Sequence, residues 1–321
     1  MNKANEKPPL IIITGPTAVG KTSLSLDLAQ QLNGEIISAD SMQVYKHMDI
    51  GTAKISKQEQ RGIPHHLIDI LEPEQSFHVA SFQSSAKDVL QDLYKRGKTP
   101  IVVGGTGFYI QALLYDIDFS KGEEDLAYRL ELKKMEQEVG VVALHEHLRK
   151  KDPRSAEVIH PNNVKKVIRA LEYWKQTGQS ITTHNEEQRR RESPYSFRYF
   201  VLTDERSILY HNIDRRVDEM LAQGLVEEVK TLMERGLDER YQSMQGLGYK
   251  EILEYLHGKC NLEEAVYRLK RDTRHFAKRQ LTWFRREKEV IWVDKSHYRT
   301  DPTHVQSIDY PKMLRDIQNH I

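Results

Sequence analysis

Short apolar segments alternate with amphipathic stretches over the first 110 residues. Runs rich in β-branched residues predict buried strands, and they occupy 10–14, 35–38, 66–70 and 101–103. Apolar residues spaced three and four apart predict helices, one from Leu24 to Leu32 and another from Val79 to Leu93. Strands that alternate with helices in this way indicate an α/β fold with a mainly parallel sheet.

The pattern changes after about residue 118. Between 118 and 193 no strand pattern is found; a charged helix begins near Leu126, and an apolar stripe from Val164 to Trp174 is followed by a very polar stretch, 182–193. We therefore expect an α/β catalytic core formed by 8–117 and 198–321, interrupted by a helical insertion domain at 118–197. An elaborated crossover connection is the alternative interpretation of the same segment.

The rest of the chain returns to the core pattern. A strand is expected from Tyr199 to Leu202 and a last strand from Val290 to Val293. Between them the chain is expected to be helical, with a core-facing apolar stripe from Ile213 to Leu232 that ends at Gly236.

The first predicted strand is followed by a phosphate-binding motif. Residues 15–22 match G-x-x-x-x-G-K-[ST] and stand between a strand and a helix, which is the context this motif requires. Its glycines permit backbone angles that other residues avoid, and the helix N-terminus adds partial positive charge. We expect a phosphate or diphosphate site formed by Gly15, Pro16, Thr17, Ala18, Val19, Gly20, Lys21 and Thr22, with the Thr22 hydroxyl offered to Mg²⁺. The motif does not say which phosphate compound binds.

Polar residues follow the other strands of the predicted sheet. Ligands bind at the carboxyl ends of strands in open α/β sheets, so Asp40 and Thr106 are candidate site residues. Asp40 is a candidate general base or metal ligand, although it could simply cap a turn with Ser41. Asp69 is a further acid at an expected strand end. The adjacent His65 and His66 would face opposite sides of a strand, which argues against a metal site.

A strongly basic helix is expected near the C-terminal end. Asn261 resembles an N-cap, and between 268 and 288 there are nine Lys or Arg and two acids, a net charge of 9 − 2 = +7. A solvated face normally mixes signs, so this stripe favours a polyanion such as nucleic acid. A plain charged face remains the alternative, as it does for the run Arg189–Arg191.

Composition narrows the class of protein. The 321 residues contain 48 basic and 47 acidic side chains, so net charge does not decide whether nucleic acid binds. The single cysteine, Cys260, excludes an internal disulfide framework, and the polar N-terminus lacks the apolar region of a signal peptide. The longest apolar runs are too short to span a bilayer. We expect a soluble, cytoplasmic protein with no membrane partner, working as a monomer.

Several segments together resemble the tRNA dimethylallyltransferase family, also called tRNA isopentenyl-diphosphate transferases. Besides the phosphate-binding loop, the segments that carry the resemblance are 38–45 (SADSMQVY), 62–69 (GIPHHLID), 104–109 (GGTGFY), 160–162 (HPN), 169–172 (RALE), 245–251 (QGLGYKE) and 273–285 (TRHFAKRQLTWFR). The loop alone is unspecific, whereas the later segments are jointly specific and extend the likeness to residue 285.

The resemblance implies a P-loop kinase-like core and a reaction. The N6 amine of adenosine 37, beside the anticodon, would attack C1 of dimethylallyl diphosphate and release diphosphate, in tRNAs that read codons beginning with U. The family uses Mg²⁺ and no ATP. Lys21, Asp40 and Thr106 would be catalytic: Lys21 neutralises the leaving group, Asp40 accepts the proton, and Thr106 orients base or diphosphate.

The resemblance also implies contacts with the anticodon stem-loop of tRNA. They are expected from Asp40, Ser41, Met42, Gln43, Thr106, Lys165, Lys166, Arg169, Gln245, Gly246, Lys250, Arg274, Lys278 and Arg279. The chain departs from the family pattern at His211-Asn212, where a Glu-Arg pair is usual, and at Gly246, where Ala is usual. Asn212 carries no charge, so no phosphate contact of that arginine can be carried over.

Three other functions use the same motifs. An adenylate isopentenyltransferase would prenylate free AMP and needs neither the insertion nor the basic helix. A P-loop small-molecule kinase would transfer a phosphoryl group. A non-catalytic RNA-binding protein would keep the loop as a nucleotide switch.

Overall fold

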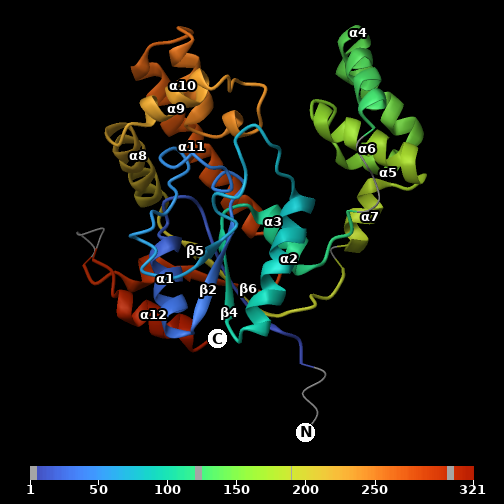
Figure 1. The fold of residues 1–321 in the computed structure, drawn as a ribbon. Coiled ribbons are helices and arrows are strands. Elements are labelled where there is room, and N and C mark those ends of the chain that lie inside the picture. Colours follow the sequence, from blue (N-terminus) through green and yellow to red (C-terminus); the bar gives the residue numbers. More distant parts are fainter. Residues whose placement is uncertain (1–5, 120–124, 189, 302–306) are drawn as a thin grey trace. The chain divides into compact units, whose positions relative to one another are not determined.

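Six parallel strands form one sheet in the computed structural model, which describes residues 6–119, 125–188, 190–301 and 307–321 (Figure 1). Their order is β3-β2-β4-β1-β5-β6. The strands are β1 (Pro9–Thr14), β2 (Gly34–Ala39), β3 (His65–His66), β4 (Thr99–Gly104), β5 (Ser196–Thr203) and β6 (Val290–Asp294). The mainly parallel α/β fold expected from the sequence is therefore confirmed.

Helices cover both faces of this sheet. In Figure 1, α1 (Lys21–Gln31) and α12 (Tyr310–Gln318) lie on one face, and α2 (Val79–Lys95) and α3 (Gly107–Leu114) lie on the other. Strand β1 is buried from its second residue onward, with Ile13 paired to Val103 of β4 and Phe200 of β5. Because side chains of a strand alternate between faces, its continuous apolar run is what a strand covered on both sides requires.

The last third of the chain adds helices beyond the carboxyl ends of the strands (Figure 1). They are α8 (Arg206–Ala222), α9 (Leu225–Glu234), α10 (Tyr249–Leu256) and α11 (Leu262–Phe284), with short 3₁₀ turns η1 (Ser243–Gln245) and η2 (Lys295–Tyr298). The core-facing stripe expected from Ile213 to Leu232 is divided between α8 and α9, because Gly224 adopts a φ of 101° and separates the two helices. Asn261 caps α11 as expected, its Oδ1 accepting from the Glu264 N–H at 2.8 Å.

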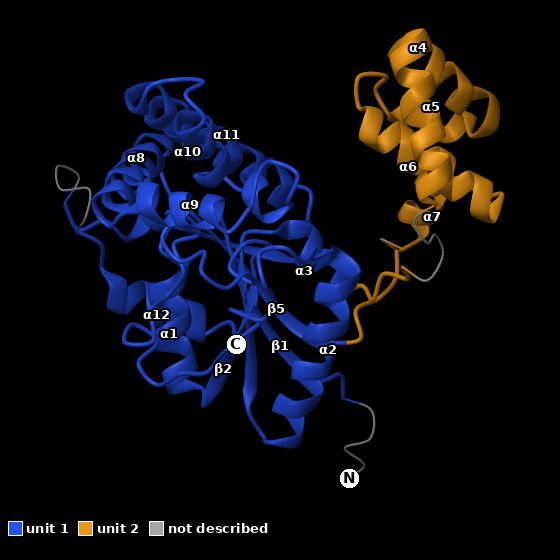
Figure 2. Cartoon of the chain, turned by 45° about the horizontal axis from the view of Figure 1, so that its top comes forward, with its two compact units in different colours: residues 1–113, 195–321 blue, residues 114–194 orange. Residues whose placement is uncertain are grey.

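The chain divides into two compact units, 1–113 with 195–321 and 114–194 (Figure 2). The second unit contains α4 (Leu126–Lys151), α5 (Pro153–Val158), α6 (Val164–Thr177) and α7 (Ile181–Gln188). Its own core joins Leu132, Leu144 and Leu148 of α4 to Val167 and Leu171 of α6. The boundaries expected from the sequence, 118 and 197, lie close to these.

The polar residues at the end of the second unit are also partly helical. The polar stretch 182–193 contains most of α7. Of the arginine run, Arg189 lies outside the described residues, and Arg191 donates to the carbonyl of Asp116 at 3.1 Å. Glu172, fully buried, accepts two hydrogen bonds from Arg129, at 2.9 and 2.8 Å.

The third expected strand is much shorter than its apolar pattern indicated. Only His65 and His66 pair with β2, because Leu67 and Asp69 then adopt positive φ angles of 62° and 55°. The chain therefore turns before Asp69, which does not end a strand. Among the described residues, no helix has both the length and the apolar character needed to cross a bilayer.

Candidate active site

The phosphate-binding loop connects β1 to α1 at the carboxyl edge of the sheet. Gly15 has a φ of 142°, and a Cβ at this position would lie 2.4 Å from the carbonyl oxygen of Leu202 on β5. Gly20 has a φ of 96° and stands as the N-cap of α1. Only glycine meets both demands, so the local sequence folds the loop closely over the sheet. The Val19 side chain is buried in the core and thereby anchors the loop to the sheet.

Lys21 folds back over this loop. Its Nζ donates to the carbonyls of Gly15 at 3.0 Å and Pro16 at 2.8 Å. Burial, together with the nearby Arg216 cation, lowers the pKa of Lys21 to about 7, and Asp40 opposes this shift. Among the described residues its hydrogen-bond partners are carbonyls, and a desolvated cation held in this way attracts an anion strongly.

Two further cations lie at the loop, and sequence reasoning did not place them there. Arg216 of α8 donates through Nη1 to Oγ1 of Thr17 at 3.5 Å, forms no ion pair within the described part of the chain, and has a pKa lowered by burial. Lys295 of η2 donates to the carbonyl of Val19 at 3.1 Å, and burial lowers its pKa as well. Neither residue belongs to a recognisable sequence motif, so neither was expected at the loop.

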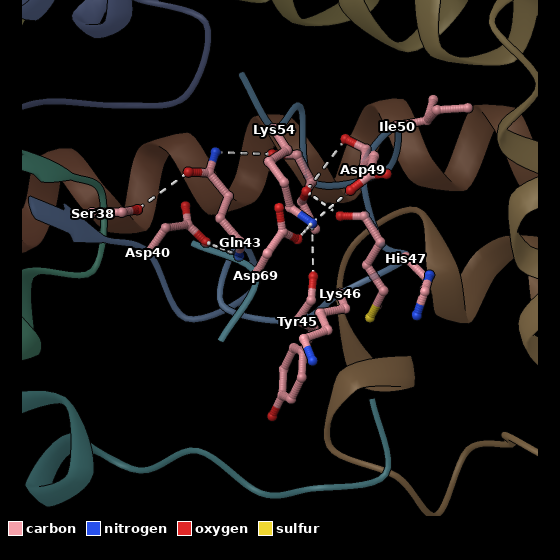
Figure 3. A network of polar contacts seen from close by, with 12 residues as sticks. Ser38, Asp40, Gln43, Tyr45, Lys46, His47, Asp49, Ile50, Lys54 and Asp69 are labelled. Atoms are coloured by element: carbon pink, nitrogen blue, oxygen red, sulfur yellow. Dashed lines mark hydrogen bonds and ion pairs between the residues drawn. The ribbon is translucent and has the colours of Figure 1, made fainter. Parts of the chain in front are cut away.

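Asp40 follows β2 and organises the turn after it. Its Oδ1 accepts hydrogen bonds from the N–H groups of Met42, at 2.8 Å, and Gln43, at 3.3 Å. Figure 3 shows the contact with Gln43. Its Oδ2 has no hydrogen-bond partner among the residues described, and Asp40 lines the cavity described below. Asp40 therefore combines the capping role weighed from the sequence with one oxygen that is free to accept a proton.

A polar network holds the segment from Asp40 to Lys54 in place (Figure 3). The amide of Gln43 accepts from the Ser38 hydroxyl at 3.2 Å and donates to the carbonyl of Thr52 at 3.3 Å. The Lys54 side chain, 4% exposed, pairs with Asp49 and Asp69, each at 2.6 Å. The Asp69 carboxylate thus stabilises this segment, and Gln43 serves the same network.

Thr106 approaches from the end of β4. Gly104 allows this strand to lie against β2, since a Cβ there would be 2.2 Å from the Ala39 carbonyl oxygen. The Thr106 N–H then donates to the same carbonyl at 3.3 Å. Gly107 packs under Trp283 of α11, where a Cβ would be 2.3 Å from the indole ring. Thr106 is therefore held beside both Asp40 and α11.

Some of these groups meet in one cavity of about 410 Å³, which Lys21 and Lys295 do not line. Its polar side includes Thr17, Asp40, Thr106 and Arg216. Its apolar wall is contributed mainly by α8, α11 and the loops beside them, and consists of Met42, Ile213, Val217, Met220, Leu247, Leu269 and Phe276. The structure thus places an anion-binding end and a carboxylate around an apolar chamber, which can hold a small molecule that has a charged head and a hydrocarbon tail.

The basic helix α11 has two different halves. Its first four cations are paired: Arg268 with Glu254 and Glu264, Lys270 with Asp218, Arg271 with Asp272 and Arg274 with Asp214. The later ones form no ion pair within the described ranges: Lys278 and Arg279 in the helix, and Arg285, Arg286 and Lys288 directly after it. A hollow on the surface of this second half is lined by His275, Lys278, Arg279, Thr282, Trp283 and Arg286.

The remaining residues expected to contact RNA fall into two groups. Ser41, Gln245, Gly246, Lys250 and Arg279 line the cavity with Met42. Lys165 and Lys166 are exposed on the first turn of α6, in the second unit. Arg169, further along the same helix, is half-buried. The first group surrounds the proposed chemistry, whereas the second group belongs to the unit 114–194.

Comparison with known proteins identifies relatives over nearly the whole chain. The IPP transferase family model matches residues 43–287. The tRNA dimethylallyltransferase of Lachnoclostridium phytofermentans is 61% identical over 293 residues, which are 91% of this chain and 94% of the relative. The tRNA dimethylallyltransferase of Carboxydothermus hydrogenoformans is 50% identical over 285 residues, 89% of this chain and 91% of the relative.

Solved structures similar to this chain belong to the same group of enzymes. The full-length tRNA isopentenylpyrophosphate transferase of Bacillus halodurans, 47% identical, superposes with a TM-score of 0.72, covering 98% of this chain and 95% of that one. A eukaryotic dimethylallyltransferase acting on tRNA, 31% identical, gives a TM-score of 0.81 and covers 98% of this chain and 80% of that one. From its sequence, its cavity and these likenesses, the chain belongs to the IPP transferase family.

Proposed function

We propose that this chain transfers a dimethylallyl group from dimethylallyl diphosphate to N6 of adenosine 37 in tRNAs that read codons beginning with U. The observation that carries this proposal is the cavity, where an anion-binding end faces an apolar wall and a carboxylate. The diphosphate matches Lys21 and Arg216, and the five-carbon tail matches the wall. We propose further that the protein works as a monomer in the cytoplasm, where tRNA is used.

The proposed step is a substitution at carbon. The N6 lone pair forms a bond to C1 of the prenyl group, while the C1–O bond breaks and its electron pair leaves on diphosphate. Backbone N–H groups of the loop, Lys21 and Arg216 stabilise that developing charge. The free Oδ2 of Asp40 accepts the proton lost by N6. Thr106 orients the base by a hydrogen bond.

Mg²⁺ fits this scheme through Thr22. The Thr22 hydroxyl stands in the first turn of α1 and forms no hydrogen bond with the residues described. The described residues contain no group of three or more His, Cys, Asp or Glu that could hold a metal on their own. In phosphate-binding loops with this motif the Ser or Thr hydroxyl contacts Mg²⁺, and the ion would add positive charge beside the leaving group.

Diphosphate binding should take up a proton at Lys21. In the empty protein its pKa is about 7, below the ordinary 10.5, so most Lys21 is neutral at pH 8. A bound polyanion favours the charged form and raises this pKa, so affinity falls as pH rises above 7. Calorimetry with inorganic diphosphate at pH 8, in two buffers of different ionisation enthalpy, measures the number of protons taken up on binding. Wild type should take up about one proton more than Lys21→Arg, because the arginine is always charged.

The protonation of diphosphate itself is the same for both proteins and cancels in this difference. Equal proton uptake by wild type and Lys21→Arg would show that Lys21 is already charged before the anion binds.

We assign tRNA binding to the basic residues in the second half of α11 and just after it that form no ion pair with described residues, among them Lys278 and Arg286. The unit 114–194 contributes as well, including Lys165 and Lys166. Reversing Lys278 and Arg286 to Glu should raise the Kd for tRNA at least about tenfold at low salt and reduce the salt slope by about one per lost phosphate contact. Filter binding over a salt series measures both quantities. Lys230→Glu, a single charge reversal at an exposed position of α9, is the control and should change neither. An unaltered slope in the double variant would remove this face from the RNA interface.

One assay separates the proposed function from its rivals. The protein is incubated with labelled dimethylallyl diphosphate and tRNA, AMP or no acceptor, and the series is repeated with ATP. Label in tRNA supports the proposal, and label in AMP selects the adenylate enzyme. ATP consumption without prenyl transfer indicates a kinase, and binding without turnover indicates a switch.

A further inference from the structure

Gln280 of α11 joins two loops that come from different strands. Its side-chain amide is buried, 6% exposed, at the carboxyl edge of the sheet. Its Oε1 accepts from the N–H of Thr17, in the phosphate-binding loop, at 2.9 Å. Its Nε2 donates to the carbonyl of Gly105, in the loop that carries Thr106, at 3.0 Å. One planar amide therefore spans the gap between the two loops.

The surrounding sequence is adapted to this contact. One neighbour is a donor and the other an acceptor, and a side-chain amide, which carries one group of each kind, meets both in a single orientation. Gly105 makes room for it, because a Cβ at that position would lie 2.1 Å from Nε2 of Gln280. The φ angle of Gly105 is not in the left-handed region, so its backbone conformation does not require glycine. Glycine is required here because the Gln280 side chain occupies the space that a Cβ would fill.

The two loops serve opposite ends of the reaction. Thr17 and Thr106 both line the cavity, with the diphosphate expected at the first and the adenine at the second. Substitution at C1 needs the leaving oxygen and the attacking nitrogen aligned, and a misplacement of about 1 Å can cost about 10²-fold in rate. The rate of prenyl transfer should therefore depend on the distance between these two loops, which Gln280 bridges.

We propose that Gln280 is a positioning residue for prenyl transfer: it holds the phosphate-binding loop and the Thr106 loop in register without touching either substrate. This inference rests on the proposed function. It predicts that removing the amide slows the chemical step, while each substrate alone still binds to the loop that recognises it.

Gln280→Met tests this, since methionine keeps the length of the side chain and removes both hydrogen bonds. The single-turnover rate of prenyl transfer should fall roughly 10-fold to 10²-fold. The separate Kd values for tRNA and for inorganic diphosphate should change less than about threefold, because the groups that bind each substrate remain in place. Gln83→Met is the matched control, a buried glutamine on α2 that donates to the Ala112 carbonyl at 2.7 Å, away from the cavity.

Gly105→Ala provides an independent route to the same contact, because its Cβ displaces Nε2 while Gln280 stays in the chain. If both variants act through one contact, the double variant should be no slower than the slower single variant. Circular dichroism and thermal unfolding confirm that each variant is folded, and a variant that fails to fold leaves the other to decide.

A folded Gln280→Met or Gly105→Ala with an unchanged single-turnover rate would overturn the inference. So would a loss that appears mainly in the two Kd values, or one that Gln83→Met reproduces. If wild type transfers no prenyl group to tRNA, the proposed function itself fails. If wild type does so and Gln280→Met is equally fast, only the positioning role fails.

Discussion

Prenyl transfer by Lys21→Met is expected to be roughly 10³-fold slower than by wild type. Methionine keeps most of the volume of the lysine and removes the charge that stands at 3.0 and 2.8 Å from the carbonyls of Gly15 and Pro16. As C1–O breaks, charge accumulates on the diphosphate, and a desolvated cation stabilises that charge more than it stabilises the ground state. The single-turnover rate with saturating dimethylallyl diphosphate and tRNA measures the effect.

Lys98→Met is the matched control for this variant. Lys98 precedes β4 at the amino end of the sheet and donates to Oδ1 of Asn33 at 2.7 Å, so the same substitution should leave the rate unchanged. A rate for Lys21→Met within about threefold of wild type would exclude Lys21 from leaving-group stabilisation, given the roughly 10²–10³-fold scale expected for such groups.

Asp40→Asn is expected to slow the same step by roughly 10²-fold or more. Asparagine keeps an oxygen that accepts from the N–H groups of Met42 and Gln43, so the turn should survive. At the position of Oδ2 it presents an N–H₂ group, which cannot accept the proton from N6. The substitution thus separates the proton-accepting role from the capping role that the same residue fulfils.

Affinity for tRNA should stay nearly unchanged in Asp40→Asn, because asparagine keeps the shape of the side chain and Asp40 is only one of many expected RNA contacts. Asp309→Asn is the matched control, since Asp309 caps α12 through the N–H of Lys312 at 3.0 Å. A normal rate in Asp40→Asn would refute the general-base role. A normal rate constant combined with a weaker tRNA Kd would instead assign Asp40 to RNA binding.

Features that depend on local sequence were predictable. The strand, the glycines at 15 and 20 and the helix that starts at Lys21 are consecutive, so their pattern specifies the loop directly. Asp40 and Thr106 follow strands, and parallel strands place their carboxyl ends along one edge. The expected cluster of these residues follows from topology alone, and the structure shows both on the same cavity.

Features that depend on distant contacts were not predictable. The +7 charge of α11 suggested one uniform basic face, but Asp214 and Asp218 of α8 and Glu254 of α10 neutralise part of its first half. Periodicity shows which residues share a face of one helix, but not which acids another helix brings to it. Arg216 and Gln280 were missed as site residues for the same reason, since Thr17 lies about 200 and 260 residues earlier in the chain.

Single residues also changed the backbone where apolar patterns were continuous. The stripe from Ile213 to Leu232 is divided between two helices, because Gly224 ends the first segment with a left-handed turn. Positive φ angles at Leu67 and Asp69 end β3 early, and the displaced Asp69 pairs with Lys54. A left-handed leucine is rarely anticipated from sequence, because its side chain disfavours that conformation.

The central claim is that residues 15–22 and Arg216 bind the diphosphate while the apolar wall binds the prenyl tail. A crystal structure with an unreactive thio analogue of dimethylallyl diphosphate tests it directly. The account predicts phosphate oxygens within hydrogen-bond distance of Lys21, Arg216 and loop N–H groups, and the prenyl carbons against Met220, Leu269 or Phe276. An analogue bound elsewhere, or bound with its tail at the loop and its phosphates at the apolar wall, would contradict it.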